Sequence, residues 1–365
     1  MMTGVKNWLA ADSPHIRFVC VILLVAALNV FVRLSFLPLT TSTDGDTYMS
    51  SAQLLSGDNG AVFPGRLLKP LAPLGIALFA PLFHGDFVAG FLALNILCYF
   101  LLAIVMYALL LLFTTERFLA MLGTLVFLST YPILEYGLNL YSEMGAWLLF
   151  VAALLGIVRY YRDASWKNFF IATATVAGGL LWKEYSVIPG IFFGLVLLHE
   201  STHTWKEKIA RIGILGTCSA VTLGSMALLI YLNYHYTYVD WIREAALVDP
   251  TQSQRHPYFI LKSLFAVFIL GWGLVLAGLV NWRSMSHRDQ WTLALLFPPS
   301  MMFLLWTFVS SRLYYIVAPL LAILALHGLR SLTESRLVQV CIVIAIMSGS
   351  YAWLFASGTL RIFLQ

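Results

Sequence analysis

Long apolar stretches separated by short polar ones occupy the chain from Val19 to Phe355. A bilayer core roughly 30 Å thick needs about 20 residues of helix to cross it, and only helices or closed barrels satisfy their backbone hydrogen bonds in lipid. The apolar positions are continuous rather than alternating, which argues against a barrel. The pattern therefore predicts an all-α protein, a polytopic transmembrane helical bundle.

We expect about eleven spans, although one apolar run does not fit that scheme. The run Leu67–Phe83 is short and contains three prolines, so we expect it to lie against the outer interface as a juxtamembrane or re-entrant helix. Residues 38–86 then form a first external loop, residues 232–258 a second, and residues 1–365 a single membrane domain. The expected spans are residues 17–37, 87–113, 118–133, 143–159, 168–182, 185–198, 212–231, 259–280, 291–309, 313–327 and 337–356.

The first span and the two short spans near the middle of the chain each have a feature that bears on their assignment. The first, from Arg17 to Leu37, is too long for a signal-peptide core and lacks a small-residue cleavage pattern after it, so we expect it to be retained. The segments 168–182 and 185–198 are short and break at Lys183-Glu184. We expect them to form a hairpin beside a watery cavity, where short spans are tolerated.

The composition agrees with a membrane protein, since 60% of residues are apolar and only 11% are charged. A soluble domain carries roughly a quarter charged residues. The formal charge of +5 would suggest nucleic acid in a soluble protein, but the basic residues lie in short loops between spans. We therefore expect membrane lipids and no nucleic acid as partners. The cysteines all lie in apolar runs and predict neither disulfides nor a metal site: Cys20, Cys98, Cys218 and Cys341.

The loop charges predict the orientation in the membrane. When the sides alternate along the chain, one side receives thirteen basic residues, with dense clusters at 159–167 and 206–211, and the other receives nine. The positive-inside rule makes the first side cytoplasmic. The N-terminus is then cytoplasmic, the C-terminus lies outside, and the protein resides in a cell (inner) membrane.

The stretch Thr41–Tyr48 is the most polar one near the first span, and it contains Asp44 and Asp46. One aspartate could cap the helix that begins there, but two exceed what a cap requires. A carboxylate can act as general base toward a hydroxyl or bind a hard cation. A divalent cation such as Mg or Mn, if one is used at all, would bind these two aspartates.

Further polar residues lie on the same predicted non-cytoplasmic face. Arg66 and Lys69 could extend to lipid headgroups or bind a phosphate, and Lys183 and Glu184 could neutralise one another. Tyrosines at this depth are usually interfacial belt residues, whereas a carboxylate that opens a span needs a partner. The remaining members of the set are Glu135, Tyr136, Tyr141, Glu143, Arg312 and Tyr314.

One other motif invites a different interpretation. His199-Glu200-x-x-His203 matches the HExxH pattern of zinc proteases, in which a helix places both imidazoles on one face. The motif falls in a predicted cytoplasmic loop without an evident third ligand, so we do not expect a protease. The sequence contains no P-loop, no GxGxxG motif after a strand and no GxSxG motif, which leaves nucleotide-driven chemistry without support.

Taken in order, these motifs resemble the membrane glycosyltransferases of the C superfamily (GT-C), which include protein O-mannosyltransferases and aminoarabinose transferases. The resemblance covers most of residues 17–327. It rests on the acidic pair with Tyr48 and Ala52, Arg66–Pro73, Pro132-x-x-Glu135-Tyr136, Tyr141-Ser142-Glu143, Trp182-Lys183-Glu184, and Arg312-Leu313-Tyr314 before Pro319.

The resemblance implies a GT-C-like fold and transfer of a sugar from a polyprenyl-phosphate carrier to a hydroxyl of a glycan, lipid or protein acceptor, on the periplasmic or extracellular face. In the family the first external loop supplies the catalytic acid, usually four residues before the tyrosine, which falls on Asp44. The family often has a second acid next to the first, whereas Gly45 intervenes here, so Asp44 and Asp46 are both catalytic candidates.

The other candidates take supporting roles, because departure of the phosphate needs cations and attack from the opposite side inverts the anomeric carbon. The candidates for binding the donor phosphate are Arg66, Lys69, Lys183 and Arg312. The candidates for orienting the sugar or acceptor are Tyr48, Glu135, Glu143, Glu184 and Tyr314.

Two other functions stay open. A flippase or transporter for lipid-linked sugars would typically show paired halves with broken helices in matching positions, and no such symmetry is found. A non-catalytic assembly subunit could dock a partner through the aromatic stretch Asn233–Trp241.

Overall fold

The computed structural model describes residues 14–39, 43–247, 257–305 and 309–364, and in these ranges every regular element is a helix. The helices are α2 (Pro14–Phe36), α3 (Thr43–Leu55), α4 (Pro64–Leu67), α5 (Leu71–Phe79), η1 (Ala80–Phe83), α6 (Phe87–Leu110), α7 (Arg117–Leu128), η2 (Ile133–Gly137), α8 (Glu143–Arg162), α9 (Trp166–Leu180), η3 (Glu184–Ser186), α10 (Val187–His199), α11 (Trp205–Tyr234), α12 (Tyr238–Leu247), α13 (Pro257–Phe268), η5 (Ile269–Gly271), α14 (Trp272–Val280), η6 (Trp282–Ser284), α15 (His287–Met301), η7 (Met302–Leu305), η8 (Ser311–Val317), α16 (Ala318–Leu332) and α17 (Arg336–Leu364). The all-α prediction is confirmed for this part of the chain.

Seven helical segments in the described ranges are long and apolar enough to cross a bilayer: 15–36, 87–110, 143–162, 205–234, 257–280, 311–332 and 336–357. The other four predicted spans correspond to α7, α9, α10 and α15, which have only 12 to 15 residues each. The membrane bundle is thus confirmed, while the count of eleven spans stays a prediction. The predicted cytoplasmic N-terminus, residues 1–13, and residues 248–256 of the second loop lie outside the described residues.

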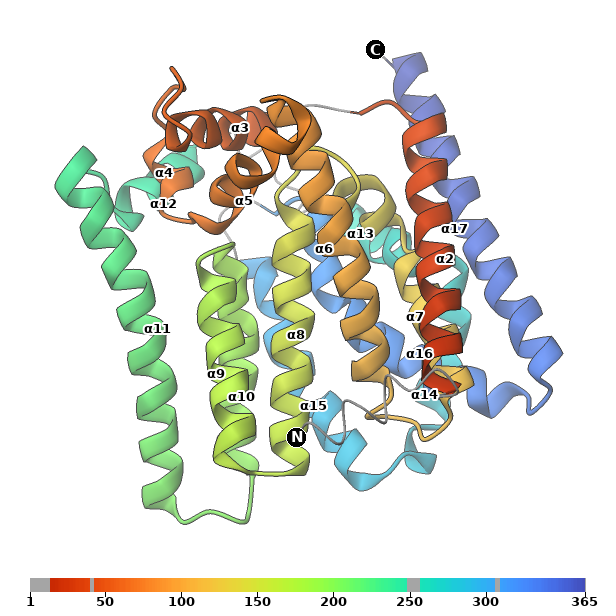
Figure 1. Cartoon of the computed structure of the whole chain (residues 1–365). Helices are drawn as coiled ribbons and strands as arrows, with labels where there is room; N and C mark the ends of the chain where they lie inside the picture. The colour runs from red at the N-terminus through yellow and green to blue at the C-terminus, as the bar shows by residue number, and fades with distance from the viewer. Residues whose placement is uncertain (1–13, 40–42, 248–256, 306–308, 365) are drawn as a thin grey trace.

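Short helices form a layer at one end of the bundle, at the top of Figure 1, where α3, α4 and α5 of the first loop lie together with α12 of the second. The run Leu67–Phe83 is divided by its prolines into α4, α5 and η1. The nine residues of α5 extend only about 14 Å, less than half a bilayer core. This run therefore cannot cross the membrane as one straight helix, in agreement with a juxtamembrane segment.

The two dense basic clusters lie at the opposite end. The α8–α9 and α10–α11 connections, which contain residues 159–167 and 206–211 or border them, are at the bottom of Figure 1. The α9–α10 turn, with Lys183 and Glu184, is at the end where α3–α5 lie. The chain thus separates the basic loops from the predicted site by the length of the bundle.

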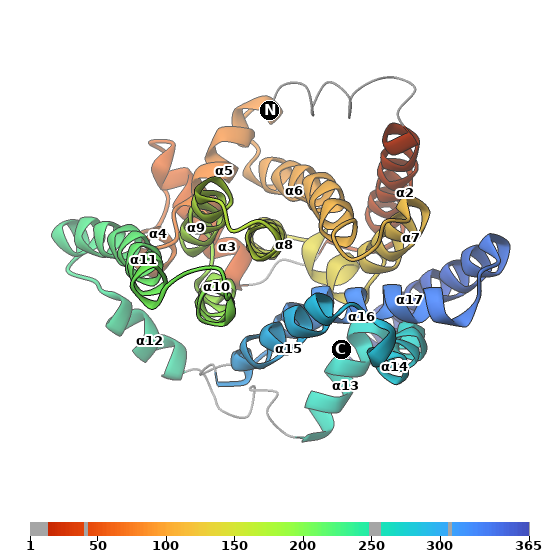
Figure 2. The same ribbon diagram turned by 90° about the horizontal axis from the view of Figure 1, so that it is seen from below.

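The centre of the bundle is formed by α6, α7, α8 and α16, whose inward residues are almost fully buried. By contrast, α11 and α17 lie at the periphery in Figure 2, and few of their residues are buried, as expected for helices that face lipid. Helices α14 and α16 pack closely because Gly278 and Gly328 have no side chain at their contact. A Cβ at either position would collide with the facing backbone carbonyl.

Candidate active site

Seven charged side chains lie together at the end of the bundle that α3–α5 cover, and we call them the carboxylate–cation cluster. They come from the first loop, from the start of α8, from the α9–η3 turn and from η8. The members are Asp44, Arg66, Lys69, Glu143, Lys183, Glu184 and Arg312. Segments almost 270 residues apart in sequence therefore contribute to one site.

Asp44 lies in the first turn of α3 and contacts three cations. Arg66 donates to its Oδ1, the Arg312 Nη1 lies 2.6 Å from its Oδ2, and the Lys183 Nζ lies 3.9 Å from the same oxygen. Burial raises the pKa of Asp44, but Arg312, Lys183 and Arg66 together hold it well below its usual range. Asp44 is therefore an ionised carboxylate bound by cations.

Glu143 is the first residue of α8, and it shares two of these cations. Its side chain is 1% exposed, and its Oε1 lies 3.1 Å from the Lys183 Nζ and 3.4 Å from the Arg312 Nη1. Lys183 also donates to the Ser142 hydroxyl at 2.9 Å. Burial lowers the pKa of Lys183, but Glu143, Tyr48 and Asp44 raise it above its usual value. Lys183 and Arg312 thus bridge Asp44 and Glu143.

Lys69 and Glu184 form the second part of the cluster. The Lys69 Nζ donates to the Glu184 Oε2 at 2.8 Å and lies 3.9 Å from the centroid of the Trp241 ring, a cation–π contact. Glu184 therefore pairs with Lys69 and not with Lys183, contrary to the simple neutralisation that the sequence allowed. Trp241 belongs to α12 and to the aromatic stretch for which the sequence suggested only a docking surface for a partner.

Tyr48 lies on the buried side of α3, below two of the cations. Its ring centroid is 4.8 Å from the Arg66 Cζ and 5.6 Å from the Lys183 Nζ. Burial raises the pKa of Tyr48, but Lys183, Lys69 and Arg66 bring it below its usual value. Its buried hydroxyl has no hydrogen-bond partner among the described residues, so it is available to a ligand.

The two aspartates of the first loop have different environments. Asp44 belongs to the cluster, whereas Asp46 is exposed to solvent on α3. Packing explains why the residue between them is a glycine, because a Cβ at Gly45 would collide with the backbone carbonyl of Leu140. This close approach brings the start of α3 against the segment that leads into Glu143.

Two of the predicted tyrosines lie beside the cluster. The Arg312 guanidinium lies 5.4 Å from the centroid of the Tyr141 ring, and the Tyr136 hydroxyl is 2.5 Å from the Ser311 Oγ. The remaining two candidates are also buried, Glu135 in η2 and Tyr314 in η8, where the Tyr314 ring packs edge-on against Phe303.

The surroundings of Asp44 and Asp46 do not fit a divalent cation. Asp44 already directs both oxygens at arginine or lysine, and Asp46 is exposed. In the described part of the chain no group of three or more His, Cys, Asp and Glu residues could hold a metal ion. Four cations already surround the three carboxylates, which electrostatically disfavours a further positive ion.

No protein-family model matches the chain. No curated protein matches it in sequence either. Several solved structures are similar. ArnT from Cupriavidus metallidurans, bound to undecaprenyl phosphate, aligns with a TM-score of 0.66 and 16% identity over 90% of this chain. The Archaeoglobus fulgidus oligosaccharyltransferase with Zn and sulfate gives a TM-score of 0.59 and 13% identity over 92% of the chain. AglB from the same organism, with an inhibitory peptide and a dolichol-phosphate, gives 0.59 and 11% over 93%.

These similarities concern the fold. The chain spans 63% of the length of ArnT bound to undecaprenyl phosphate and 53% and 56% of the two archaeal chains. The proteins that it resembles are GT-C membrane glycosyltransferases, and the predicted GT-C-like fold is confirmed.

Proposed function

We propose that this protein is an integral-membrane glycosyltransferase that moves a sugar from a polyprenyl-phosphate carrier to an acceptor hydroxyl, with inversion, on the predicted periplasmic or extracellular face. The observation that carries the proposal is the carboxylate–cation cluster, in which four cations face three carboxylates and leave one positive charge in excess. The support from comparison is that ArnT and AglB, which share the fold, were solved with undecaprenyl phosphate and dolichol-phosphate.

The cations bind the phosphate of the donor. The guanidinium groups of Arg66 and Arg312 are suited to bidentate contact with phosphate oxygens, and Lys183 adds a point charge beside them. As the bond between the anomeric carbon and the phosphate oxygen breaks, negative charge develops on the leaving phosphate. Cations held in advance by the fold stabilise that charge without reorganisation.

Asp44 is the general base, and donor binding activates it. A carboxylate bound by three cations is a poor proton acceptor, because the cations hold its pKa low. A phosphate that competes for Arg66, Arg312 and Lys183 weakens those contacts, so the pKa of Asp44 rises towards its ordinary value. Asp44 then takes the proton of the acceptor hydroxyl, whose oxygen attacks the anomeric carbon and displaces the polyprenyl phosphate.

Glu143 and Glu184 position the cations in this scheme. Each binds one lysine of the cluster at 3.1 Å or less, Glu143 through its Oε1 and Glu184 through its Oε2. The buried Oε2 of Glu143 has no hydrogen-bond partner among the described residues. The Tyr48 hydroxyl is buried beside the same cations and has no hydrogen-bond partner among the described residues. It is therefore well placed to donate a hydrogen bond to the lipid-linked sugar. Glu135 and Tyr314 remain candidates for contact with the sugar or the acceptor.

A transfer assay tests the proposal. Purified protein in detergent is incubated with a panel of polyprenyl-phosphate-linked sugars and a cell-envelope extract, and the release of polyprenyl phosphate is measured. Loss of general-base catalysis in Asp44→Asn is expected to lower the rate about 10²–10⁴-fold. The exposed Asp58→Asn is the matched control and keeps the wild-type rate.

The rival aspartate gives a second, independent result. If Asp44 is the base, Asp46→Asn retains transfer; if only Asp46→Asn abolishes it, the two roles are exchanged. A folded Asp44→Asn protein with full turnover contradicts the mechanism. Wild-type protein that binds the donor but never cleaves it supports a flippase or an assembly subunit instead.

A further inference from the structure

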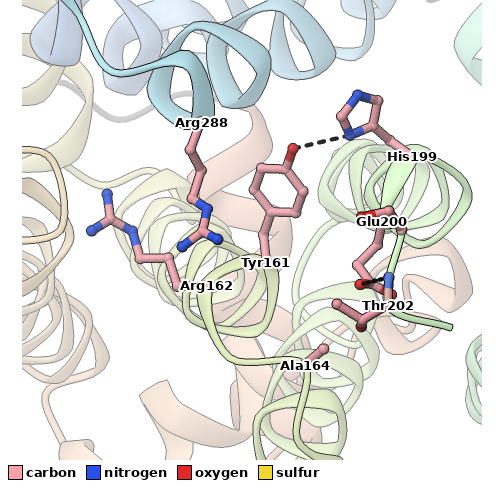
Figure 3. Close-up of a pocket in the computed structure, with 8 residues that line it drawn as sticks. Tyr161, Arg162, Ala164, His199, Glu200, Thr202 and Arg288 are labelled. Carbon is pink, nitrogen blue, oxygen red and sulfur yellow. Dashed lines mark hydrogen bonds between the residues drawn. The ribbon is translucent and has the colours of Figure 1, made fainter.

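A second polar site lies at the opposite end of the bundle from the carboxylate–cation cluster. It is a pocket of about 160 Å³ between the end of α8, the end of α10 and the start of α15, and we call it the basic-end pocket. The side chains that matter here are Tyr161, Arg162, His199, Glu200, Thr202 and Arg288 (Figure 3). Pockets for drug-sized ligands usually measure about 300–1,000 Å³, so this one suits a small group.

Positive charge lies on one side of the basic-end pocket. Figure 3 shows the side chains of Arg162 and Arg288 on the same side, across from Glu200. The Arg162 Nη2 donates to the Asp289 Oδ1 at 3.0 Å, but its buried Nε has no partner among the described residues. Arg288 is exposed, and none of the ion pairs found in the described ranges includes it. One side of the pocket therefore offers unused donors to an anion.

The opposite side offers an acceptor without a hydrogen-bond donor. Glu200 is only 5% exposed, and its Oε1 accepts the Thr202 backbone N–H at 2.5 Å. Its buried Oε2 has no hydrogen-bond donor in the described part of the chain, and the His203 Nε2 at 3.6 Å is too distant for a hydrogen bond. The His203 imidazole is at ion-pair distance from this oxygen but makes no hydrogen bond to it. Leaving a buried carboxylate oxygen without a hydrogen-bond donor costs free energy, so this atom has the capacity for a further donor.

The HExxH residues of this chain do not form the helical motif that they form in zinc proteases. Helix α10 ends at His199, and Glu200 adopts an extended conformation with ψ of 131°. His199 and His203 are therefore not on one helical face. His199 instead accepts from or donates to the Tyr161 hydroxyl at 2.9 Å, and its ring packs on Trp291.

Exposed aromatic and apolar side chains lie at the same end of the bundle as the pocket. Trp166, Trp205 and Trp291 are all exposed at this end of the bundle, and so is Leu198, which precedes His199. Tryptophan concentrates at the depth of lipid headgroups. The basic-end pocket is thus placed where a headgroup can enter it while the acyl chains cover the neighbouring apolar surface.

We propose that the basic-end pocket binds the headgroup of a phosphoethanolamine lipid. The phosphate contacts Arg288 and the Nε of Arg162, and the primary ammonium donates to the Oε2 of Glu200. A choline headgroup has no N–H that could donate a hydrogen bond to Glu200. A glycerol headgroup has no positive charge that could pair with Glu200. The ammonium therefore distinguishes the three lipid classes, independently of the transferase activity proposed for the other end.

Lipid binding to the purified full-length chain tests this assignment. Native mass spectrometry and lipid-dependent thermal shift compare dioleoyl phosphatidylethanolamine, phosphatidylcholine and phosphatidylglycerol. We expect the ethanolamine lipid to bind about tenfold more tightly than either of the others, as for one hydrogen bond to a charged group. Glu200→Gln removes this preference, and Arg288→Gln weakens all three lipids.

Arg283→Gln is the matched control, since Arg283 is an exposed arginine at the same end outside the pocket and its loss leaves binding unchanged. Free phosphoethanolamine separates a lipid from a soluble ligand, and equally tight binding of the free compound overturns the lipid assignment. Equal affinity for the three lipids, in the wild type and in Glu200→Gln alike, overturns the proposal altogether. Arg288 is exposed, so its variant tests the site even if Glu200→Gln fails to fold.

Discussion

The two charged ends of the bundle are built differently. In the carboxylate–cation cluster, Asp44 and Glu143 each contact at least two cations, and Lys183 and Glu143 are almost completely buried. At the basic end, Arg162 forms one ion pair with Asp289, and its side chain is 32% exposed. One end is a network of shared charges with a buried centre, and the other combines single ion pairs with buried polar atoms that lack a hydrogen-bond partner.

This difference has energetic and functional consequences. Removing one partner from a buried network leaves a charge without compensation, whereas an exposed pair contributes little because water screens it. The network also keeps its cations in place before a substrate arrives, which suits stabilisation of developing charge. The basic end, with donors and one acceptor that make no hydrogen bond within the described part of the chain, suits reversible binding.

The largest effect is expected for Lys183→Met. The substitution leaves Glu143, which is 1% exposed, and Asp44 with one cation fewer. Breaking such a buried pair destabilises a protein by about 3–5 kcal/mol. Unfolding in detergent measures the loss, and the double variant Lys183→Met/Glu143→Gln recovers part of it. A single variant as stable as the wild type would show that the cluster is well solvated.

The next effect concerns activity and contrasts one arginine from each end. Arg312→Gln removes a preorganised donor to the leaving phosphate and lowers turnover about 10²–10³-fold. Arg288→Gln, at the basic end, leaves turnover essentially unchanged. Both are measured as release of polyprenyl phosphate. Similar losses in the two variants would mean that the basic end takes part in transfer.

An intermediate effect is expected for Gly45→Ala. Its new Cβ collides with the Leu140 carbonyl, and such overpacking costs about 1–3 kcal/mol. Gly213→Ala in α11 is the matched control, because a Cβ there meets no atom within 4 Å. Thermal unfolding of the two variants measures the difference, and equal melting temperatures would remove the packing explanation for Gly45.

The pH dependence sharpens the comparison further. The pKa of Asp44 is lower in the folded protein than its ordinary value of 3.8, so Asp44 contributes stability that is fully present above about pH 4. That contribution is lost as the pH falls from there through the folded pKa. Asp44→Asn therefore flattens the acid limb of the unfolding free energy below pH 4. An unchanged acid limb would contradict the three-cation environment of Asp44.

The smallest effect is expected for Arg330→Gln. Arg330 pairs with Glu116 at 3.6 Å, and both side chains are more than half exposed. Exposed pairs of this kind contribute less than about 1 kcal/mol. The change in unfolding free energy is therefore close to the error of the measurement, and a loss as large as that of Lys183→Met would erase the distinction between the two kinds of ion pair.

The sequence predicted the fold well because lipid imposes simple demands. The continuous apolar runs required helices, and the prolines of Leu67–Phe83 predicted that this run would not cross as one straight helix. The segments that contribute to the site could also be recognised in the sequence, because charged residues next to hydrocarbon are energetically costly and therefore rare. Trp241 was not recognised, because an aromatic residue in a loop has many uses and no local pattern connects it with Lys69.

What the sequence determined by itself is the inventory: the helices, the separation of basic loops from acidic ones, and the short set of polar residues that required partners. Only the tertiary structure decided the pairing, such as Lys69 with Glu184, Asp44 rather than Asp46 in the cluster, and a Glu200 oxygen without a hydrogen-bond donor. Helix periodicity and hydropathy act over neighbouring residues, so they are visible in the chain. Ion pairs between segments depend on where the helices meet, and that depends on packing across the whole bundle.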